Sequence, residues 1–255
     1  MQTNRVPTVD LRDLIASDLV GAPLITPLDF LTEFSSAELP VLAPYEQLVL
    51  AALARAVSPA YVVEFGTGQG FSGYIWAANT PDMARVVSVD LAPDLRADYT
   101  AKILRNDNEV GRAYRAAPGA AKIEQVLIRP GETLPEELEL LKGKVDVIFI
   151  DGDHSYDGVQ HDTETGYMLA RSDATFIWHD FYRFPGYLAE GKERRGVYPF
   201  LNEVAADSYL DLYHISGTYL VVGRRAWSLD DVDDPAQPAD AVGEMRERII
   251  RLGEF

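Results

Sequence analysis

Residues 63–73 read VEFGTGQGFSG, and this stretch decides the fold. A short apolar run, 61–65, ends at Gly66, and an apolar segment with helical spacing, 70–78, follows. The run predicts a buried strand, the second segment predicts a helix, and glycines between them allow a tight turn and a close approach to the backbone. A plain strand-to-helix connection with chance glycines is the alternative, but the strand before and the helix after favour a ligand-binding turn.

Strands and helices alternate along the chain on both sides of this turn. That order predicts an α/β fold with a Rossmann-like, doubly wound, mostly parallel sheet of seven strands, helices on both faces and a closing antiparallel hairpin. The predicted strands are 61–65, 85–90, 123–128, 145–151, 174–179, 211–216 and 219–222. The predicted helices are 44–57, 70–78, 93–106, 135–141, 156–170 and 197–206.

The domain prediction has three parts. Residues 1–42 form an N-terminal extension that serves as a substrate cap or dimer contact and contains a short helix at 8–20. Residues 43–225 form the main domain, and residues 226–255 form an acidic linker and a polar helix at 240–251. We expect a homo-oligomer, with a dimer contact in the C-terminal part.

The composition excludes several classes of function. The 255 residues carry a formal net charge of −17 and no cysteine, which excludes disulfides, cysteine-based zinc sites and cysteine nucleophiles. So acidic a surface repels phosphate backbones, so we expect no nucleic-acid partner. No apolar run is long enough to span a bilayer and no secretory signal is visible, so we expect no membrane partner and a cytoplasmic location.

Two cofactors compete for the glycine turn. The pattern Gly68-x-Gly70-x-x-Gly73, with Asp90 about 20 residues on, matches a dinucleotide fingerprint. Counted from Gly66, where the strand ends, that pattern fails. A carboxylate at Glu64 would also repel a pyrophosphate, whereas it suits a cationic ligand.

The segment Glu64-x-Gly66-x-Gly68-x-Gly70 resembles motif I of class I S-adenosylmethionine (SAM)-dependent methyltransferases. The resemblance implies that the glycine turn lies against the methionine and ribose parts of SAM, that Asp90 binds the ribose hydroxyls and that Glu132 contacts the adenine. The full set of implied cofactor contacts is Glu64, Gly66, Thr67, Gly68, Gly70, Ser72, Asp90, Leu91, Glu132, Asp151 and Tyr156.

Four acids, Glu64, Asp90, Asp151 and Asp180, each stand at the carboxyl end of a predicted strand. In a doubly wound sheet these ends converge on one crevice, where ligands bind. Several carboxylates in one crevice are stable only if something cationic lies among them. A sulfonium, an ammonium or a divalent metal would satisfy this requirement.

The string DGDHSY, 151–156, together with His179-Asp180, resembles a subgroup of small-molecule methyltransferases, including O-methyltransferases of sugars and natural products, some of them Mg²⁺-dependent. The resemblance implies that Asp151, His179 and Asp180 are metal ligands, and that His154, as general base, and Asp151 are catalytic. His179 stands where related enzymes have an acid. Because Mg²⁺ prefers oxygen ligands, a histidine there favours a transition metal or no metal.

The expected function is therefore SAM-dependent transfer of a methyl group to a hydroxyl of a small molecule, with possible assistance from Mg²⁺. Two alternatives stay open: an NAD(P)-dependent oxidoreductase and a non-catalytic cofactor-binding protein. The aromatic and basic loop 181–196 is expected to act as a lid over the ligand.

Overall fold

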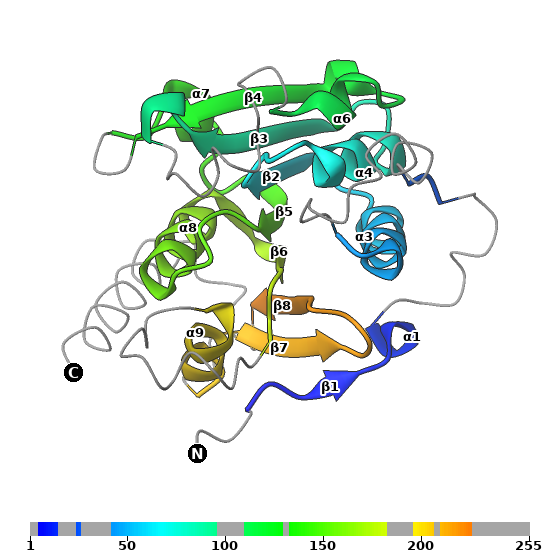
Figure 1. Ribbon diagram of the computed structural model, residues 1–255, viewed down its shortest axis with the longest axis vertical. Coiled ribbons are helices and arrows are strands. Elements are labelled where there is room, and N and C mark those ends of the chain that lie inside the picture. The colour runs from blue at the N-terminus through cyan, green and yellow to red at the C-terminus, as the bar shows by residue number, and fades with distance from the viewer. Residues whose placement is uncertain are drawn as a thin grey trace.

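The computed structural model describes residues 5–14, 24–26, 42–95, 110–129, 133–182, 196–206 and 210–225. These residues contain one eight-stranded sheet with the order β1-β7-β8-β6-β5-β2-β3-β4 (Figure 1). All neighbouring strands are parallel except β8, which runs antiparallel to β6 and β7. The Rossmann-like sheet with a closing hairpin is thereby confirmed. Its strands are β1 Thr8–Val9, β2 Tyr61–Phe65, β3 Arg85–Leu91, β4 Ile123–Ile128, β5 Val145–Ile150, β6 Ala170–Trp178, β7 Leu210–Ile215 and β8 Val221–Arg225.

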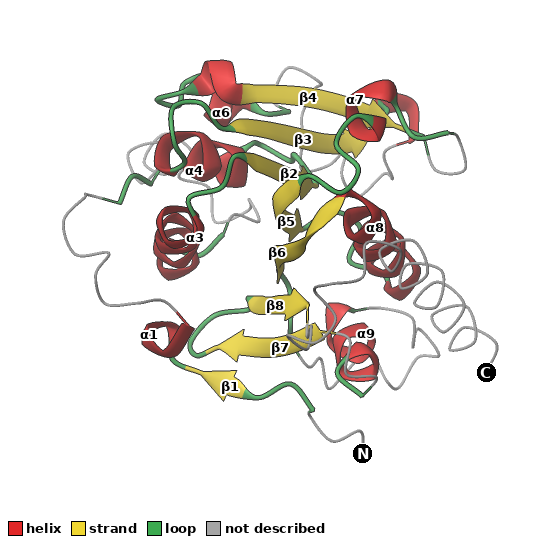
Figure 2. Ribbon diagram, turned by 180° about the vertical axis from the view of Figure 1, so that it is seen from behind, coloured by secondary structure: helices red, strands yellow, loops and turns green. Residues whose placement is uncertain are grey.

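Helices cover both faces of the sheet. α3 and α4 lie on one face, and α8 and α9 lie on the other (Figures 1 and 2). The described helices are α1 Leu11–Leu14, α3 Pro44–Val57, α4 Phe71–Asn79, α6 Arg112–Arg115, α7 Glu136–Glu139, α8 Tyr156–Leu169 and α9 Val197–Val204, with 3-10 turns η2 Pro93–Leu95 and η4 Ala120–Lys122.

The central strand β5 shows why the sequence folds into three layers. All six of its residues are buried. Val147 and Phe149 join the apolar cluster under α3 and α4, whereas Ile148 and Ile150 join the cluster under α8 and α9. A strand that is apolar on both sides can be stable only between two helical layers, which is the arrangement typical of parallel sheets.

The prediction of seven strands and of a helix at 8–20 was wrong at the N-terminus. Residues Thr8–Val9 form an eighth strand that pairs in parallel with β7. The His214 N–H donates to the Pro7 carbonyl at 2.8 Å, and the Ser216 N–H donates to the Val9 carbonyl at 2.9 Å. The open edge of β7 offers these hydrogen bonds, and helical periodicity in a short segment cannot reveal them. Among the described residues of 8–20, only Leu11–Leu14 is helical, and residues 15–20 are not described.

Other predicted elements are shorter than expected or lie outside the described residues. The predicted helix 93–106 is represented by the single turn Pro93–Leu95, because residues 96–109 are not described. The structure likewise does not describe Glu132, most of the predicted lid or the predicted helix 240–251. None of the described helices is long and apolar enough to cross a membrane.

Candidate active site

Each glycine of the turn after β2 has a positive φ, at 98° for Gly66, 47° for Gly68 and 86° for Gly70. The three positions differ in what surrounds them. A Cβ on Gly66 would lie 2.1 Å from the Asp151 carbonyl oxygen, and one on Gly70 would lie 2.8 Å from the Gly111 Cα. A Cβ on Gly68 would have no atom of the described residues within 4 Å, apart from its chain neighbours. Gly66 and Gly70 are therefore required by packing, whereas the described residues leave space beside Gly68.

Glu64 lies beneath this turn and is fully buried, facing α4. It pairs in register with Ser88 on β3, whose hydroxyl donates to Glu64 Oε1 at 2.6 Å. Its other oxygen, Oε2, has no hydrogen-bond partner among the described residues. Burial is the main cause that raises the pKa of Glu64 to about 7, and the charges of Asp151 and Asp90 add to it against the hydrogen bonds from Ser88 and Ser72. We expected this carboxylate to be open to a ligand at the end of the strand, but in the structure it is buried between β2 and α4.

Replacing Glu64 by glutamine should make stability less dependent on pH. A carboxyl whose pKa rises from 4.5 to about 7 on folding contributes most below pH 4.5, and its contribution is lost as the pH rises through 7. Glutamine does not titrate. The free energy of unfolding of Glu64→Gln relative to wild type should therefore improve by about 3 kcal/mol between pH 5 and pH 8. Urea unfolding at the two pH values measures this change, and parallel pH dependences of the two proteins would contradict it.

A chain of polar groups leads from the buried Glu64 to the exposed Gln125 on the edge strand β4. The hydroxyls of Ser88 and Thr67 are 2.8 Å apart. Gln125 donates to Thr67 Oγ1 at 3.4 Å, and the Tyr114 hydroxyl donates to Gln125 at 3.4 Å. The sequence analysis did not predict Ser88 or Gln125 as site residues. The serine inside the apolar run RVVSVD, 85–90, is a usable signal, because a buried hydroxyl needs a hydrogen-bond partner.

Asp90 and Leu91 end β3 beside the glycine turn. The Leu91 N–H donates to Asp90 Oδ1 at 2.7 Å, and both side chains are partly exposed. The preceding carbonyl, that of Val89, accepts from the Gly66 N–H at 2.8 Å. The predicted ribose-binding acid thus stands at the end of the strand next to the turn, as a shared ligand site requires.

The carboxyl ends of β5 and β6 bring together Asp151, His154, His179 and Asp180, which we call the acid–histidine cluster. His154 Nδ1 is 2.8 Å from Asp180 Oδ2, and its Nε2 is 3.5 Å from Asp151 Oδ1. His179 Nδ1 is 3.2 Å from Asp151 Oδ1. One ligand atom from each of Asp151, His154 and Asp180 lies within 4.8 Å of the others, a spacing that a metal ion could bridge.

The backbone at Asp180 is strained. Its φ is 61°, a left-handed conformation that side chains other than glycine adopt rarely, although aspartate tolerates it better than most. Such conformations persist where the surroundings hold the residue in place, and they concentrate at functional sites. Burial acts to raise the pKa of Asp180, but hydrogen bonds from His154 and His179 outweigh it and lower that pKa well below its usual value.

His154 is half exposed and lies between two carboxylates. Burial acts to lower its pKa, but the hydrogen bonds and charges of Asp151 and Asp180 prevail and raise it to about 10. With the carboxylates free, His154 therefore holds both ring protons at neutral pH. It can accept a proton there only when positive charge beside Asp151 and Asp180 lowers this pKa.

His179 is placed differently from the predicted metal ligand. Its side chain is 12% exposed, and its Nε2 lies 3.3 Å from the Glu46 carboxylate while its Nδ1 faces Asp151. Both ring nitrogens thus face carboxylates, as do those of His154. Among the described residues, the group whose ligand atoms lie close enough to share a metal ion consists of Asp151, His154 and Asp180, without His179. The sequence analysis did not predict Glu46 as a site residue, because in the sequence it is only an acid in the first turn of a predicted helix.

Two residues near the cluster have roles that the sequence did not show. Tyr156 donates its hydroxyl to Glu203 at 2.6 Å and packs its ring edge-on against Phe200, so it points toward α9. Asp162, on α8, would come within 2.8 Å of a Cβ on Gly152. Burial and the charge of Asp153 raise the pKa of Asp162 to about 7.

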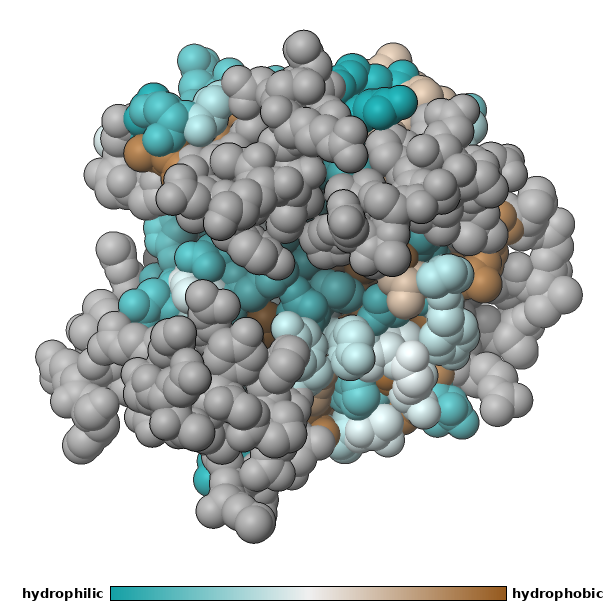
Figure 3. Space-filling model, viewed as in Figure 1, coloured by the Kyte–Doolittle hydropathy of each residue, from teal (hydrophilic) through white to brown (hydrophobic). Residues whose placement is uncertain are grey.

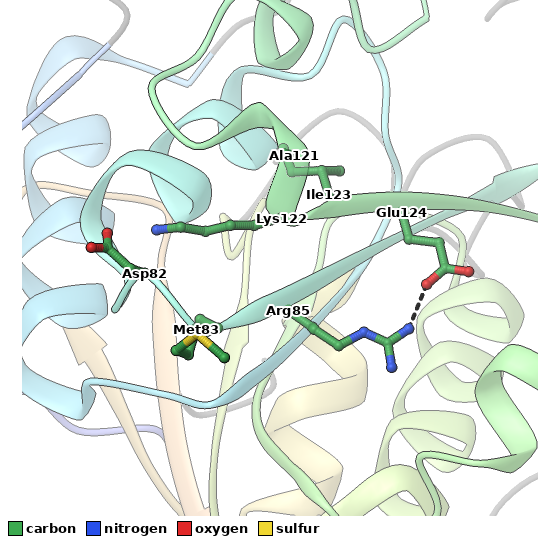
Figure 4. A pocket seen from close by; sticks show the side chains of 8 residues that line it. Asp82, Met83, Arg85, Ala121, Lys122, Ile123 and Glu124 are labelled. Carbon is green, nitrogen blue, oxygen red and sulfur yellow. Dashed lines mark hydrogen bonds and ion pairs between the residues drawn. The ribbon is translucent and has the colours of Figure 1, made fainter.

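A hollow at the opposite edge of the sheet does not belong to this site. It is lined by residues at the amino ends of β3 and β4, where Arg85 and Glu124 form an exposed ion pair at 2.6 Å (Figure 4). In Figure 3, hydrophilic residues are visible across the middle of the face shown.

Comparison with solved structures agrees with this architecture. The chain is similar to cofactor-bound Rv0187 from MTB, with 24% identity, a TM-score of 0.53, and coverage of 83% of this chain and 94% of that chain. It is also similar to an O-methyltransferase from Bacillus cereus in complex with SAH, with 18% identity, a TM-score of 0.52, and coverage of 84% of this chain and 100% of that chain. A third similar structure is the O-methyltransferase TomG from Streptomyces achromogenes, involved in tomaymycin synthesis, in complex with SAM. It has 20% identity, a TM-score of 0.52, and coverage of 88% of this chain and 99% of that chain.

At the level of sequence, no curated protein matches the chain. Residues 63–181 match the model of a family described as a methyltransferase domain, and this range contains the glycine turn and the whole acid–histidine cluster. The chain thus has the fold of methyltransferases of known structure, and its residues 63–181 match a methyltransferase domain.

Proposed function

We propose that this protein is a SAM-dependent methyltransferase that acts on a hydroxyl of a small molecule. One observation carries the proposal. The open face of the glycine turn at Gly68, the acid Asp90 and the acid–histidine cluster all lie at the carboxyl edge of the same parallel strands. That edge is where doubly wound sheets bind their ligands. The two similar O-methyltransferases that were solved with SAH and SAM support the choice of cofactor.

The residues at this edge fit SAM. The positive φ values of the turn let a ligand approach the backbone, and Gly68 leaves space for it. Asp90 can accept hydrogen bonds from a ribose diol. SAM carries a sulfonium and an ammonium group, and a cation is what several neighbouring carboxylates need. When bound, it supplies a methyl group on positively charged sulfur.

The donor set also fits a divalent cation. Asp151 and Asp180 offer carboxylate oxygens, which Mg²⁺ prefers, and these two residues would hold the cation while His154 serves as the base. A cation held there would lower the pKa of the acceptor hydroxyl.

His154 is the proposed general base. Asp180, at 2.8 Å, orients the ring through Nδ1 and leaves Nε2 to take the hydroxyl proton. A cation held by Asp151 and Asp180 would lower the pKa of His154, and the neutral ring could then accept the hydroxyl proton. The cluster residues also align the acceptor and exclude water, which supplies much of the rate in methyl transfer.

Calorimetric titration with S-adenosylhomocysteine (SAH) and NADH, with and without Mg²⁺, tests this proposal. We expect SAH to bind and NADH not to bind. Binding of NADH without SAH would favour the oxidoreductase alternative, for which the pattern Gly68-x-Gly70-x-x-Gly73 is the specific observation. SAH binding that is indifferent to Mg²⁺, in a protein that releases no SAH from SAM with any hydroxylated acceptor, would favour a non-catalytic cofactor-binding protein.

A further inference from the structure

Glu46 lies outside the strand ends that form the candidate site, yet it reaches the acid–histidine cluster. It stands in the first turn of α3 and is 2% exposed. Its Oε2 accepts from the Ala43 N–H at 2.9 Å and so caps the start of the helix. A capping role accounts for this one bond. It does not account for the burial of a carboxylate, which needs further donors.

Two more donors meet Glu46, each from a different part of the fold. The Tyr219 N–H, just before β8, donates to Glu46 Oε1 at 2.7 Å. The His179 ring, just after β6, brings Nε2 to 3.3 Å from Glu46 Oε2. One buried carboxylate therefore joins the start of α3, the turn before β8 and the end of β6.

The opposite side of the His179 ring faces the candidate reaction centre. His179 Nδ1 is 3.2 Å from Asp151 Oδ1 and 3.5 Å from Asp180 Oδ1. With an acceptor on each side, the ring can rotate only by giving up at least one hydrogen bond. Glu46 thereby fixes the plane of the ring and the direction from which it donates to Asp151.

We infer that Glu46 is a positioning residue of the active site, which acts through His179 to orient the Asp151 carboxylate toward the bound ligand. The inference rests on the proposed function for the role of Asp151 but not for the contacts themselves. Outer partners that orient a ligating group typically affect binding or activity by 10- to 100-fold, roughly.

Glu46→Gln is the test variant, because glutamine keeps the size of the side chain but replaces one acceptor oxygen by a donor. Asp146→Asn is the matched control. Asp146 is also a buried carboxylate that accepts two backbone N–H groups, those of Ala60 and Tyr61 at 2.8 Å, and a cation, Arg171, at 2.7 Å. Both variants should lose stability, because each loses a buried hydrogen-bonded carboxylate. Asp146 lies at the amino ends of the strands, away from the cluster, so only Glu46→Gln should affect the cluster.

The first readout is NMR of the histidine rings, of which the chain has four. Ring N–H protons that donate to buried carboxylates exchange slowly, and the loss of signals in His179→Gln assigns those of His179. We expect these signals in wild type and in Asp146→Asn, and we expect Glu46→Gln to lose or shift them. Unchanged His179 signals in Glu46→Gln would overturn the inference.

The second readout is the Kd for SAH in the presence of Mg²⁺. We expect it to rise about tenfold in Glu46→Gln and to stay within about twofold of wild type in Asp146→Asn. The double variant with His179→Gln should bind no more weakly than His179→Gln alone, because Glu46 acts through that ring. Additive losses would contradict this path. If wild type itself ignores SAH, the proposed function fails, and the NMR signals still decide whether Glu46 holds His179.

Discussion

Gly66→Ala is expected to cost about 3 kcal/mol or more of unfolding free energy, from a left-handed conformation and an overpacked neighbour together. Gly66 has a φ of 98°, and an added Cβ would lie 2.1 Å from the Asp151 carbonyl oxygen. That oxygen belongs to the backbone and cannot rotate away, so the ends of β2 and β5 must separate. Urea unfolding measures the loss, and SAH binding should be lost with it.

Gly68→Ala is the matched control for this prediction. Its φ of 47° lies in the left-handed region that side chains can adopt at modest cost, and its Cβ would meet no atom of the residues that the structure describes within 4 Å. We expect a loss of roughly 1 kcal/mol of stability but a large loss of SAH affinity, because the methyl group fills the space proposed for the ligand. Equal destabilisation by the two alanines would contradict the distinction between a packing glycine and a ligand-facing glycine.

Asp151→Asn is expected to have the second large effect, since this carboxylate faces both His154 and His179. Breaking a buried ion pair costs about 3 kcal/mol of stability when the partner charge stays behind. We also expect SAH release from SAM, in the presence of an accepted hydroxyl compound, to fall at least about 100-fold in Asp151→Asn and in His154→Ala. SAH affinity should fall by about tenfold in Asp151→Asn, as in Glu46→Gln, and unchanged turnover in both variants would remove the catalytic assignment.

The stability loss in Asp151→Asn should depend on pH with a maximum. Burial opposes ionisation of Asp151, but the histidines lower its pKa below 3.8, so its contribution is present above that pH and is lost as the pH falls. The pKa of His154 is raised from 6.5 to about 10, so its contribution is complete below pH 6.5 and is lost as the pH rises through 10. The difference from wild type should therefore be largest between about pH 4 and pH 6.5, and a flat profile in urea unfolding would contradict it.

The central part of the fold was predictable because its signals are local. A strand such as β5, buried on both sides, needs a continuous apolar run, and the run 145–150 shows it. A glycine turn between a strand and a helix likewise appears within ten residues of sequence. The pairing of β1 with β7 was not predictable, since the hydrogen bonds that define it join Thr8–Val9 to residues about 200 positions later.

The candidate site divides in the same way. Residues that directly follow a strand, such as Asp151 and Asp180, could be named from the sequence because parallel strands end at one edge. Their detailed roles could not be named, since those roles depend on partners from elsewhere in the fold. Glu46 reaches His179 from a position 133 residues away in the chain, and the Tyr156 hydroxyl donates to Glu203 on α9.

The placement of β1 at the edge of the sheet also has a consequence for the order of assembly. Thr8 pairs with His214, so β1, the first of the described strands, can join the sheet only after β7 has been synthesised. Closing so long a loop is entropically costly and slow compared with forming β2, β3 and β5. During synthesis β1 therefore stays unpaired until late, and its pairing with β7 completes that edge of the sheet.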